Sequence, residues 1–249
     1  ADHAHDLWPA LAGRMYSMLG FSFSCVNDYP RSYRALAKAK PLALQANDHK
    51  GLVQVVNGLG SYYTQLGQYE EALVEFQQAR ALTVEDGDIS SQASCANNVG
   101  ICLQELKRFS EARKEYEHCW RLSMQEGSPE GQARACVRLG SIFLQQGAVL
   151  RGVLCLRKAS MVFQELKLLG DLADASVLLG RGIIHGRDKL PWSVADQQHR
   201  AAVFLNAALR VSKAVDLHPT HMASRMYLGL LALWCGDADE AVQQVESYL

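Results

Sequence analysis

The sequence lacks both a charge excess and a long apolar run. It carries 25 lysines and arginines against 26 aspartates and glutamates, which gives a formal net charge of −1. Proteins that bind nucleic acid usually show a basic excess, so this balance predicts no nucleic-acid partner. No stretch of about 18 uninterrupted apolar residues occurs, so we expect no transmembrane helix. The composition, 49% hydrophobic and 20% charged residues, is typical of a folded chain with a continuous core.

The first residues also lack the basic and then apolar pattern of a secretory signal. The 7 cysteines include no Cys-x-x-Cys pair, and their number is odd. We therefore expect reduced thiols in a cytoplasmic protein, most of them packed as small hydrophobic groups on helix faces.

Sequences diagnostic of catalysis or metal binding are missing as well. There is no phosphate-binding loop, no Gly-x-Ser-x-Gly and no zincin motif. His218 and His221 have a spacing that metal ligands on a helix use, but Pro219 lies between them and no third ligand is near in the sequence. A hairpin turn is the simpler interpretation of this segment. We predict no enzymatic activity, no cofactor and no metal site.

A 40-residue repeat is what the sequence does contain. The dipeptide Leu-Gly, replaced once by Val-Gly, recurs at the same place in each repeat, and the spacing of its glycines is constant except for a longer last step. This recurrence over most of the chain indicates a repeat architecture. We call these residues the register glycines: Gly20, Gly60, Gly100, Gly140, Gly180 and Gly229.

Other positions keep the same register. In every repeat but the fifth, a small residue follows the register glycine at a fixed distance and a large apolar one stands four positions later, as in Ala72 with Phe76 and Ala112 with Tyr116. Apolar residues three and four apart share one face of a helix. A mid-helix glycine costs about 1 kcal/mol relative to alanine. Its return in every repeat therefore predicts a place where a second helix crosses closely.

Turn signals separate the two helices of each repeat. Gly67, Lys107 and Gly147 mark such turns, and Leu169-Gly170 is interpreted in the same way. Each repeat is thus predicted to be a helix, a short turn and a second helix. In the fifth repeat, glycine, proline and charged residues predict a longer loop over 186–195. Its Trp192 either docks on the adjacent helix, which is the simpler interpretation, or forms a contact site.

This pattern resembles the tetratricopeptide repeat. The best match is Leu59-Gly60-x-x-Tyr63, followed by Gly67-x-Tyr69, Ala72, Phe76 and Ala79. The resemblance implies an all-α fold, a right-handed α-α superhelix of about six helical hairpins. The 40-residue period, longer than the usual period of about 34, is similar to that of the subclass found in rapsyn and in spindle-orientation adaptors with Leu-Gly-Asn repeats. We expect one array over 1–249, with repeats at 10–49, 50–89, 90–129, 130–169, 170–218 and a partial 219–249.

The resemblance also implies a binding site, because the first helix of each hairpin lines a concave groove in this family. Amide side chains there can pair with a peptide backbone, and arginines can hold carboxylates. We therefore expect a protein or peptide partner with acidic residues. The alternative is that the asparagines bridge adjacent hairpins and that the arginines form a solvated face. The predicted groove residues are Asn57, Ser61, Gln65, Asn97, Asn98, Arg134, Arg138, Ser141, Gln145, Arg181 and His185.

The predicted function is that of a non-catalytic interaction scaffold or adaptor. The alternative is a structural subunit of a larger multi-protein complex, cytoskeletal or ciliary, that binds through its convex face and ends. The family's carboxylate clamp for chaperone tails is not expected, because no lysines match it beside Asn57 and Asn97. The apolar stretch 230–235 lacks the polar outer face of a terminal repeat. We expect residues beyond Leu249 to cover it, or else a partner.

Overall fold

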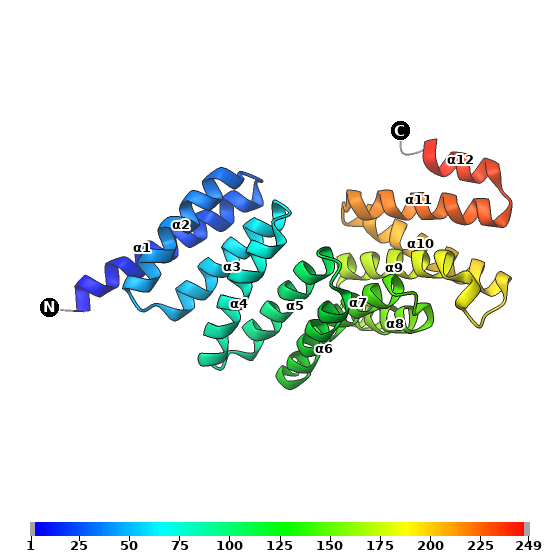
Figure 1. Cartoon of the computed structure of the whole chain (residues 1–249). Helices are drawn as coiled ribbons and strands as arrows, with labels where there is room; N and C mark the ends of the chain where they lie inside the picture. The colour runs from blue at the N-terminus through cyan, green and yellow to red at the C-terminus, as the bar shows by residue number, and fades with distance from the viewer. Residues whose placement is uncertain (1–2, 247–249) are drawn as a thin grey trace. The chain divides into compact units, whose positions relative to one another are not determined.

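The structure, a computed structural model, describes residues 3–246, with side chains from Trp8 onward except that of Val245. Every regular element within these residues is helical, and consecutive helices form hairpins (Figure 1). The chain divides into two compact units, which we call unit 1 (Ala1–Glu126) and unit 2 (Gly127–Leu249). The predicted class, an all-α solenoid of consecutive helical hairpins, is confirmed. That one continuous array spans both units stays a prediction.

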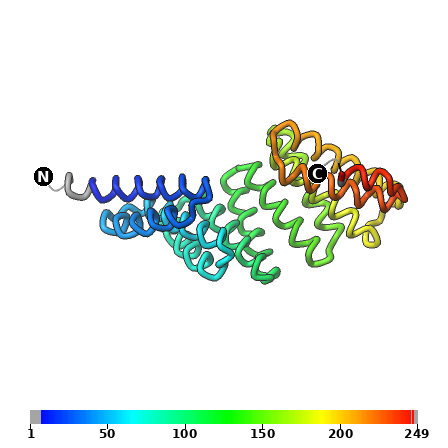
Figure 2. Tube along the Cα trace, turned by 90° about the horizontal axis from the view of Figure 1, so that it is seen from above, coloured from blue at the N-terminus to red at the C-terminus, as the bar shows by residue number. Residues whose placement is uncertain are grey.

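Each unit contains three hairpins, which lie side by side within the unit (Figure 2). None of the helices in the described residues is long and apolar enough to cross a membrane. The hairpins of unit 1 are α1 (His3–Cys25) with α2 (Tyr29–Gln45), α3 (His49–Gln65) with α4 (Tyr69–Glu85), and α5 (Ile89–Glu105) with α6 (Phe109–Glu126). Those of unit 2 are α7 (Pro129–Gln145) with α8 (Val149–Glu165), α9 (Leu169–His185) with α10 (Val194–Ala214), and α11 (His218–Cys235) with α12 (Ala238–Glu246).

The helices from α2 to α9 begin at a constant 20-residue interval, so each 40-residue repeat holds two helices of nearly equal length. Each turn between them contains one residue with positive φ, which closes the helix end: the N–H of Gln68, for example, donates to the carbonyl of Tyr63 at 2.9 Å. Glycine adopts this conformation without strain, and asparagine more readily than most residues. The positions are Asn27, Asn47, Gly67, Gly87, Lys107, Gly127, Gly147 and Lys167.

Three of the predicted turns are confirmed and one is wrong. Gly67, Lys107 and Gly147 have positive φ, as the turn signals indicated. Leu169-Gly170, however, opens α9, and the turn lies just before it, at Lys167. The first amides of a helix have no intrahelical partner, so a glycine in the first turn disturbs little. The constant interval between helix starts, more than the Leu-Gly dipeptide, marks the turns.

Five of the six register glycines, Gly20 to Gly180, are confirmed as close crossings between the two helices of a hairpin. A Cβ atom added at Gly60 would lie 2.6 Å from the Cε1 atom of Phe76, and one added at Gly100 would lie 2.5 Å from the Cε1 atom of Tyr116. The buried aromatic ring of the second helix thus occupies the space that a side chain on the first helix would need. In unit 2, Leu205 fills the corresponding space beside Gly180.

The insertion in the fifth repeat is a short structured loop. It contains the 3-10 helix η1 (Arg187–Lys189) and ends where α10 begins at Val194, slightly before the predicted 195. Trp192 packs against the core of unit 2, and the Arg200 guanidinium carbon lies 4.7 Å from the centre of its ring. Gln197 also donates to the backbone carbonyl of Trp192 at 2.8 Å. The docked interpretation of Trp192 is therefore confirmed.

The close crossing predicts a strong effect of a single methyl group. Gly60→Ala should lower the free energy of unfolding by about 1–3 kcal/mol, because overpacking against Phe76 outweighs the gain in helix propensity. Gly170→Ala is the matched control, since its Cβ would meet only Leu217 at an ordinary 3.6 Å. Urea denaturation followed by circular dichroism measures both. Equal stability of the two variants would contradict the crossing.

Candidate functional site

The exposed side of the first helices in unit 2 collects most of the predicted charged site residues. We call it the first-helix face of unit 2 and define it by the positions six and two before, and one and five after, each register glycine. Residues at this spacing line one side of a helix. All of those on α7 and α9 are exposed or half-buried: Arg134, Arg138, Ser141, Gln145, Asp174, Leu178, Arg181 and His185.

Arg134 is already engaged within the chain. Its Nη2 atom lies 3.0 Å from the Oε1 atom of Glu130 on α7 and 3.2 Å from the Oδ2 atom of Asp171 on α9. The guanidinium thereby links the first helices of two neighbouring hairpins. A carboxylate from a partner would have to compete with these two intrachain partners.

Arg138 and Arg181 differ from Arg134 in this respect. Within the part of the chain that the structure describes, neither side chain has a carboxylate oxygen within 4.0 Å. One turn after Arg181, the ring of His185 meets the ring of Tyr227 on α11 edge to face, with centroids 5.9 Å apart. The face therefore presents two uncompensated guanidinium groups and an aromatic pair across three neighbouring helices.

The predicted site residues of unit 1 separate into two groups. Ser61 and Gln65 on α3 are exposed, and Asn98 on α5 is half-buried on the corresponding side of its helix. Asn57, three residues before its register glycine, faces the next hairpin, where the Cys95 thiol on α5 donates to its Oδ1 atom at 3.8 Å. This is the contact that the bridging alternative expects for Asn57. Asn97 donates to Asn98 at 3.2 Å, so these two amides partly satisfy each other.

The apolar end of the first-helix face of unit 2 was predicted only as an apolar stretch over 230–235, and Tyr227 was missed. Tyr227, Leu230 and Trp234 on α11 stand two before, one after and five after Gly229, the offsets that identified Arg138, Ser141 and Gln145. Applying the register to the last glycine would have placed all three on this face. Leu230 is exposed, and the other two are half-buried. The face is thus basic on α7 and α9 and aromatic on α11.

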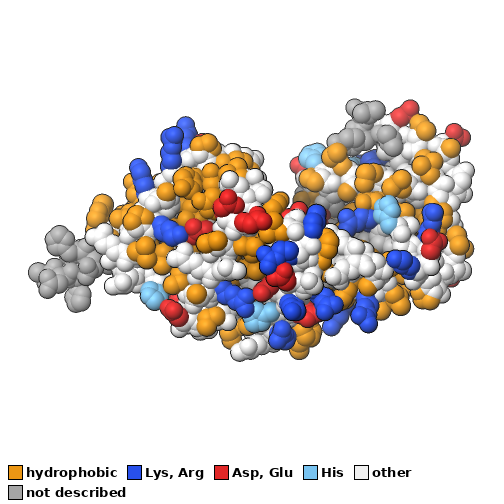
Figure 3. All heavy atoms as spheres, in the orientation of Figure 1, with side chains coloured by type: hydrophobic (Ala, Val, Ile, Leu, Met, Phe, Trp, Pro, Cys, Tyr) orange, Lys and Arg blue, Asp and Glu red, His pale blue; other side chains and the backbone are white. Residues whose placement is uncertain are grey.

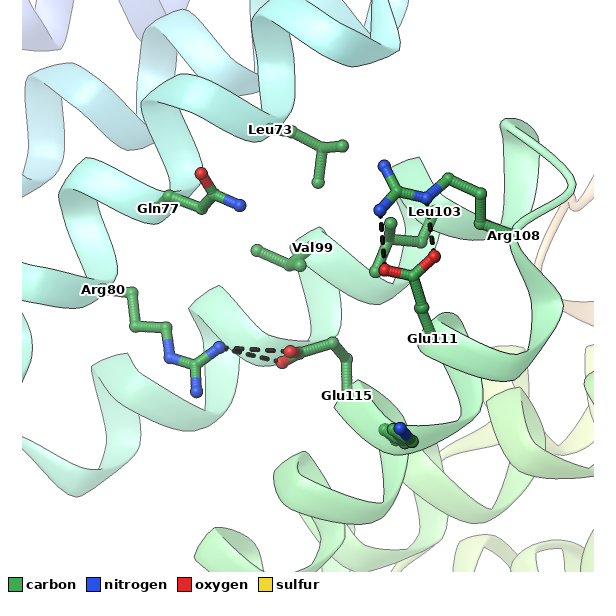
Figure 4. Close-up of a pocket in the computed structure, with 9 residues that line it drawn as sticks. Leu73, Gln77, Arg80, Val99, Leu103, Arg108, Glu111 and Glu115 are labelled. Carbon is green, nitrogen blue, oxygen red and sulfur yellow. Dashed lines mark hydrogen bonds and ion pairs between the residues drawn. The ribbon is translucent and has the colours of Figure 1, made fainter.

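A cleft of about 240 Å³ lies between the second helices α4 and α6 of unit 1 (Figure 4). Its apolar lining comes from Leu73, Val99 and Leu103. Its rim carries two ion pairs, Arg80 with Glu115 at 3.1 Å and Arg108 with Glu111 at 2.6 Å. These four rim charges are matched in pairs within the chain, and Lys114 also lines the cleft.

The Arg80 pair belongs to a ladder that follows the 40-residue register. Lys40 on α2 pairs with Glu75 on α4 at 2.9 Å, and Arg80 and Glu115 are the residues one repeat further on. Each pair joins the second helices of two neighbouring hairpins. The next positions in this register are Trp120 and Cys155, which cannot form an ion pair.

The histidines and cysteines singled out by the sequence lie in separate surroundings. His218 contacts Asp216 at 3.2 Å, whereas His221 accepts from the Nε atom of Arg225 at 3.1 Å. Burial, with the positive charge of Arg225, lowers the pKa of His221. Among the residues whose side chains are described, no group of three His, Cys, Asp or Glu is arranged to hold a metal ion. All seven cysteines are free thiols, and burial raises the pKa of three: Cys95, Cys102 and Cys155.

Comparison with known families supports the tetratricopeptide resemblance over part of the chain. The family model described as tetratricopeptide repeat matches residues 54–85, which span most of α3 and α4. No curated protein matches the sequence. The finer resemblance to rapsyn and to the spindle-orientation adaptors stays a prediction.

Solved structures share the fold at low sequence identity. A signal transduction ATPase with a tetratricopeptide repeat sensor, from Pyrococcus horikoshii, aligns with a TM-score of 0.78 and 15% identity, over 96% of this chain and only 36% of that protein. Aspartyl phosphate phosphatase F of Bacillus subtilis aligns with a TM-score of 0.79 and 15% identity, over 99% of this chain and 61% of that protein. The Rap conjugation gene regulator of plasmid pLS20, in complex with a Phr peptide, aligns with a TM-score of 0.69 and 15% identity. The alignment covers 93% of this chain and 61% of that protein.

The ion-pair ladder predicts a measurable coupling between hairpins. In a double-mutant cycle, Arg80→Met and Glu115→Gln should show a coupling energy of about 1 kcal/mol that falls with added salt, because both side chains are only partly exposed. The same cycle on Arg108 and Glu111, which are half exposed and only three residues apart, should give a smaller value. Urea denaturation measures both. A larger coupling for the second pair would contradict this assignment.

Proposed function

We propose that this chain is a non-catalytic protein-interaction module, and that the first-helix face of unit 2 binds a peptide or helical segment with acidic residues. One observation carries the proposal: Arg138 and Arg181 have no carboxylate partner among the described residues, although Arg134 beside them has two. An arginine presents five N–H donors in a planar fork that matches a carboxylate. Two such groups on neighbouring helices suit a ligand with two acidic side chains.

The rest of the face adds an apolar requirement. Four apolar side chains lie along the same side of these helices. Leu230 on α11 is exposed, and Leu178 on α9 and Tyr227 and Trp234 on α11 are half-buried. Aromatic and arginine side chains are enriched among residues that dominate binding energy at interfaces. We therefore expect the ligand to carry a large apolar side chain beside its acidic residues, and affinity to require both.

The solved relatives support a binding role of this general kind. One is a regulator whose structure holds a peptide, and another carries its tetratricopeptide repeats as a sensor. Sequence identities of about 15% indicate a shared fold and do not indicate a shared ligand. The proposed ligand therefore follows from the residues of this chain. We place the protein in the cytoplasm in this proposal. A cytoskeletal or ciliary assembly is the alternative setting.

The experiment is a selection of random linear peptides displayed on phage against the full chain, followed by affinity measurements with the enriched peptides. The peptides should be enriched in Asp and Glu and should carry Leu, Phe or Trp. The double variant Arg138→Glu with Arg181→Glu should weaken their binding by about tenfold or more, because it replaces two attractions with repulsions. Affinity for the native chain should fall with increasing salt.

The matched control places the same charge change on another surface of the same unit. Arg151 and Arg157 are exposed on the second helix α8. The double variant Arg151→Glu with Arg157→Glu should leave peptide affinity within about twofold, since only the general field changes. Peptides without acidic enrichment, or equal losses in the two double variants, would contradict the proposal.

A further inference from the structure

The cleft between α4 and α6 lies where two neighbouring hairpins of unit 1 meet. Both helices pack against α5, and the apolar lining comes from Leu73 of α4 and from Val99 and Leu103 of α5 (Figure 4). All three side chains are buried. An engineered apolar cavity of about 150 Å³ binds benzene. At about 240 Å³, the cleft therefore has room for one aromatic ring.

The equivalent place one repeat earlier, between α2 and α4, holds tyrosine rings. Tyr33 and Tyr63 stand one 40-residue repeat before Leu73 and Leu103. The rings of Tyr33 and Tyr62 have centroids 5.1 Å apart, and Tyr62 meets Tyr63 edge to face at 5.3 Å. Tyr63 also packs against a buried apolar cluster of the first two hairpins. The first pair of hairpins thus has phenol rings where the second pair has shorter leucines and a cleft.

The ion pairs beside the two places are equivalent as well. Arg80 and Glu115, at the rim of the cleft, correspond to Lys40 and Glu75 one repeat earlier. Burial raises the pKa of Tyr63, and the negative charge of Glu75 adds to this effect. The hydroxyl of a tyrosine thus lies close enough to Glu75 to respond to its charge. At the cleft, Glu115 is the corresponding hydrogen-bond acceptor.

A related place in unit 2 also holds an aromatic ring. When the longer fifth repeat is allowed for, Phe204 on α10 is the equivalent of Glu115. Its half-buried ring packs against the core of unit 2, which includes Val153 on α8 and Ile183 on α9. These two residues are the equivalents of the two leucines that line the cleft. At both related places the chain itself supplies an aromatic ring, which no described residue supplies at the cleft.

The charge at the rim is where the cleft differs from the place between α2 and α4. Basic and acidic side chains lie close together over α4 and α6 (Figure 3). Arg80 and Arg108 are paired with carboxylates, as described above. Lys114 lines the cleft where Val74 stands one repeat earlier, and its ammonium has no carboxylate oxygen within 4.0 Å in the described part of the chain. This one uncompensated cation favours a ligand with an acidic group beside its ring.

We propose that the cleft binds a tyrosine side chain of a partner protein, and that an acidic residue beside this tyrosine pairs with Lys114. The ring occupies the place that the chain's own aromatic rings occupy at the two related positions. The tyrosine hydroxyl donates to Glu115. An ionised carboxylate has about four acceptor sites, so the ion pair with Arg80 leaves room for this hydrogen bond.

The form of the cleft favours a side chain over a free small molecule. Sites that enclose small molecules have volumes of about 300–1,000 Å³ and bury most of the surface of the ligand. This cleft is smaller, and Arg108, Glu111 and Lys114 at its rim are exposed. A side chain that is held by its own backbone needs only such an open place. The site lies in unit 1 and shares no residue with the first-helix face of unit 2.

The test uses the full chain with isotope-labelled leucine and valine methyl groups, observed by NMR. The probes are three blocked tripeptides: acetyl-Glu-Tyr-Glu-amide, acetyl-Lys-Tyr-Lys-amide and acetyl-Glu-Ala-Glu-amide. The first should shift the methyl signals of Leu73, Val99 and Leu103, because an aromatic ring strongly shifts the signals of nuclei beside it. The peptide with alanine should not shift them. The methyl signals of Leu178 and Leu230 report separately on binding to the first-helix face of unit 2.

Two variants separate the contribution of the ring from that of the charge. Leu73→Tyr places a ring where Tyr33 stands one repeat earlier, so the chain should fill its own cleft and lose the binding of the Glu-Tyr-Glu peptide. The native chain should prefer the acidic over the basic tyrosine peptide by about twofold to fivefold at low salt. Lys114→Gln should remove this preference and retain the methyl shifts.

Matched controls change the same residue types at other positions. Val74→Tyr adds a ring at an exposed position next to Leu73, and Lys50→Gln removes an exposed cation on α3. Both should bind the peptides like the native chain. Circular dichroism checks that the helix content of every variant is native. If Leu73→Tyr does not fold, the methyl shifts of the native chain and of Lys114→Gln still decide the question.

Four results would overturn the inference. Shifts at Leu178 and Leu230 with none at the cleft would contradict it and leave the proposed function intact. Unchanged binding in a folded Leu73→Tyr variant would place the ring elsewhere. Equal affinity of the native chain for the acidic and basic tyrosine peptides would exclude Lys114 from the site. Free tyrosine that binds more tightly than the Glu-Tyr-Glu peptide would make the cleft a small-molecule site.

Discussion

The close approach of two helices at the register glycines from Gly20 to Gly180 is the constraint on which the rest of the structure depends. Without a Cβ at Gly60 or Gly100, the ring of Phe76 or Tyr116 lies directly against the backbone of the first helix. This contact fixes how the two helices of a hairpin cross. Through that crossing it sets which positions face the next hairpin and which face solvent. The first-helix face of unit 2 is a consequence of the same register.

Much of the fold could be predicted because its determinants are local and periodic. We located the hairpins and the crossings from the spacing of the register glycines, together with the small and the large apolar residues that follow them. The insertion was located by Pro191 and its charged neighbours, and the structure shows Trp192 docked as the simpler interpretation held. The one wrong turn, Leu169-Gly170, arose because a dipeptide was interpreted without its place in the 20-residue interval.

The site was less accessible to sequence reasoning, because it depends on contacts between repeats. Arg134 and Arg138 look alike in the sequence, yet only Arg134 lies within reach of Glu130 and Asp171. Asn57 and Ser61 were grouped together, although one faces the neighbouring hairpin and the other faces solvent. To distinguish the members of such a pair, one must know how each helix is rotated and which side chains lie opposite it. The repeat register gives neither.

The constant interval between helix starts also limits how such a chain can change in length. Removing one whole repeat would join equivalent positions and leave the remaining crossings intact. Removing half a repeat would bring a second helix, with its small residues and large rings, to the place of a first helix with its glycine. The insertion at 186–193 instead lies at a hairpin turn, and Gly180 of the preceding helix still meets Leu205 of the following one. The hairpin turns are therefore where this architecture can absorb insertions.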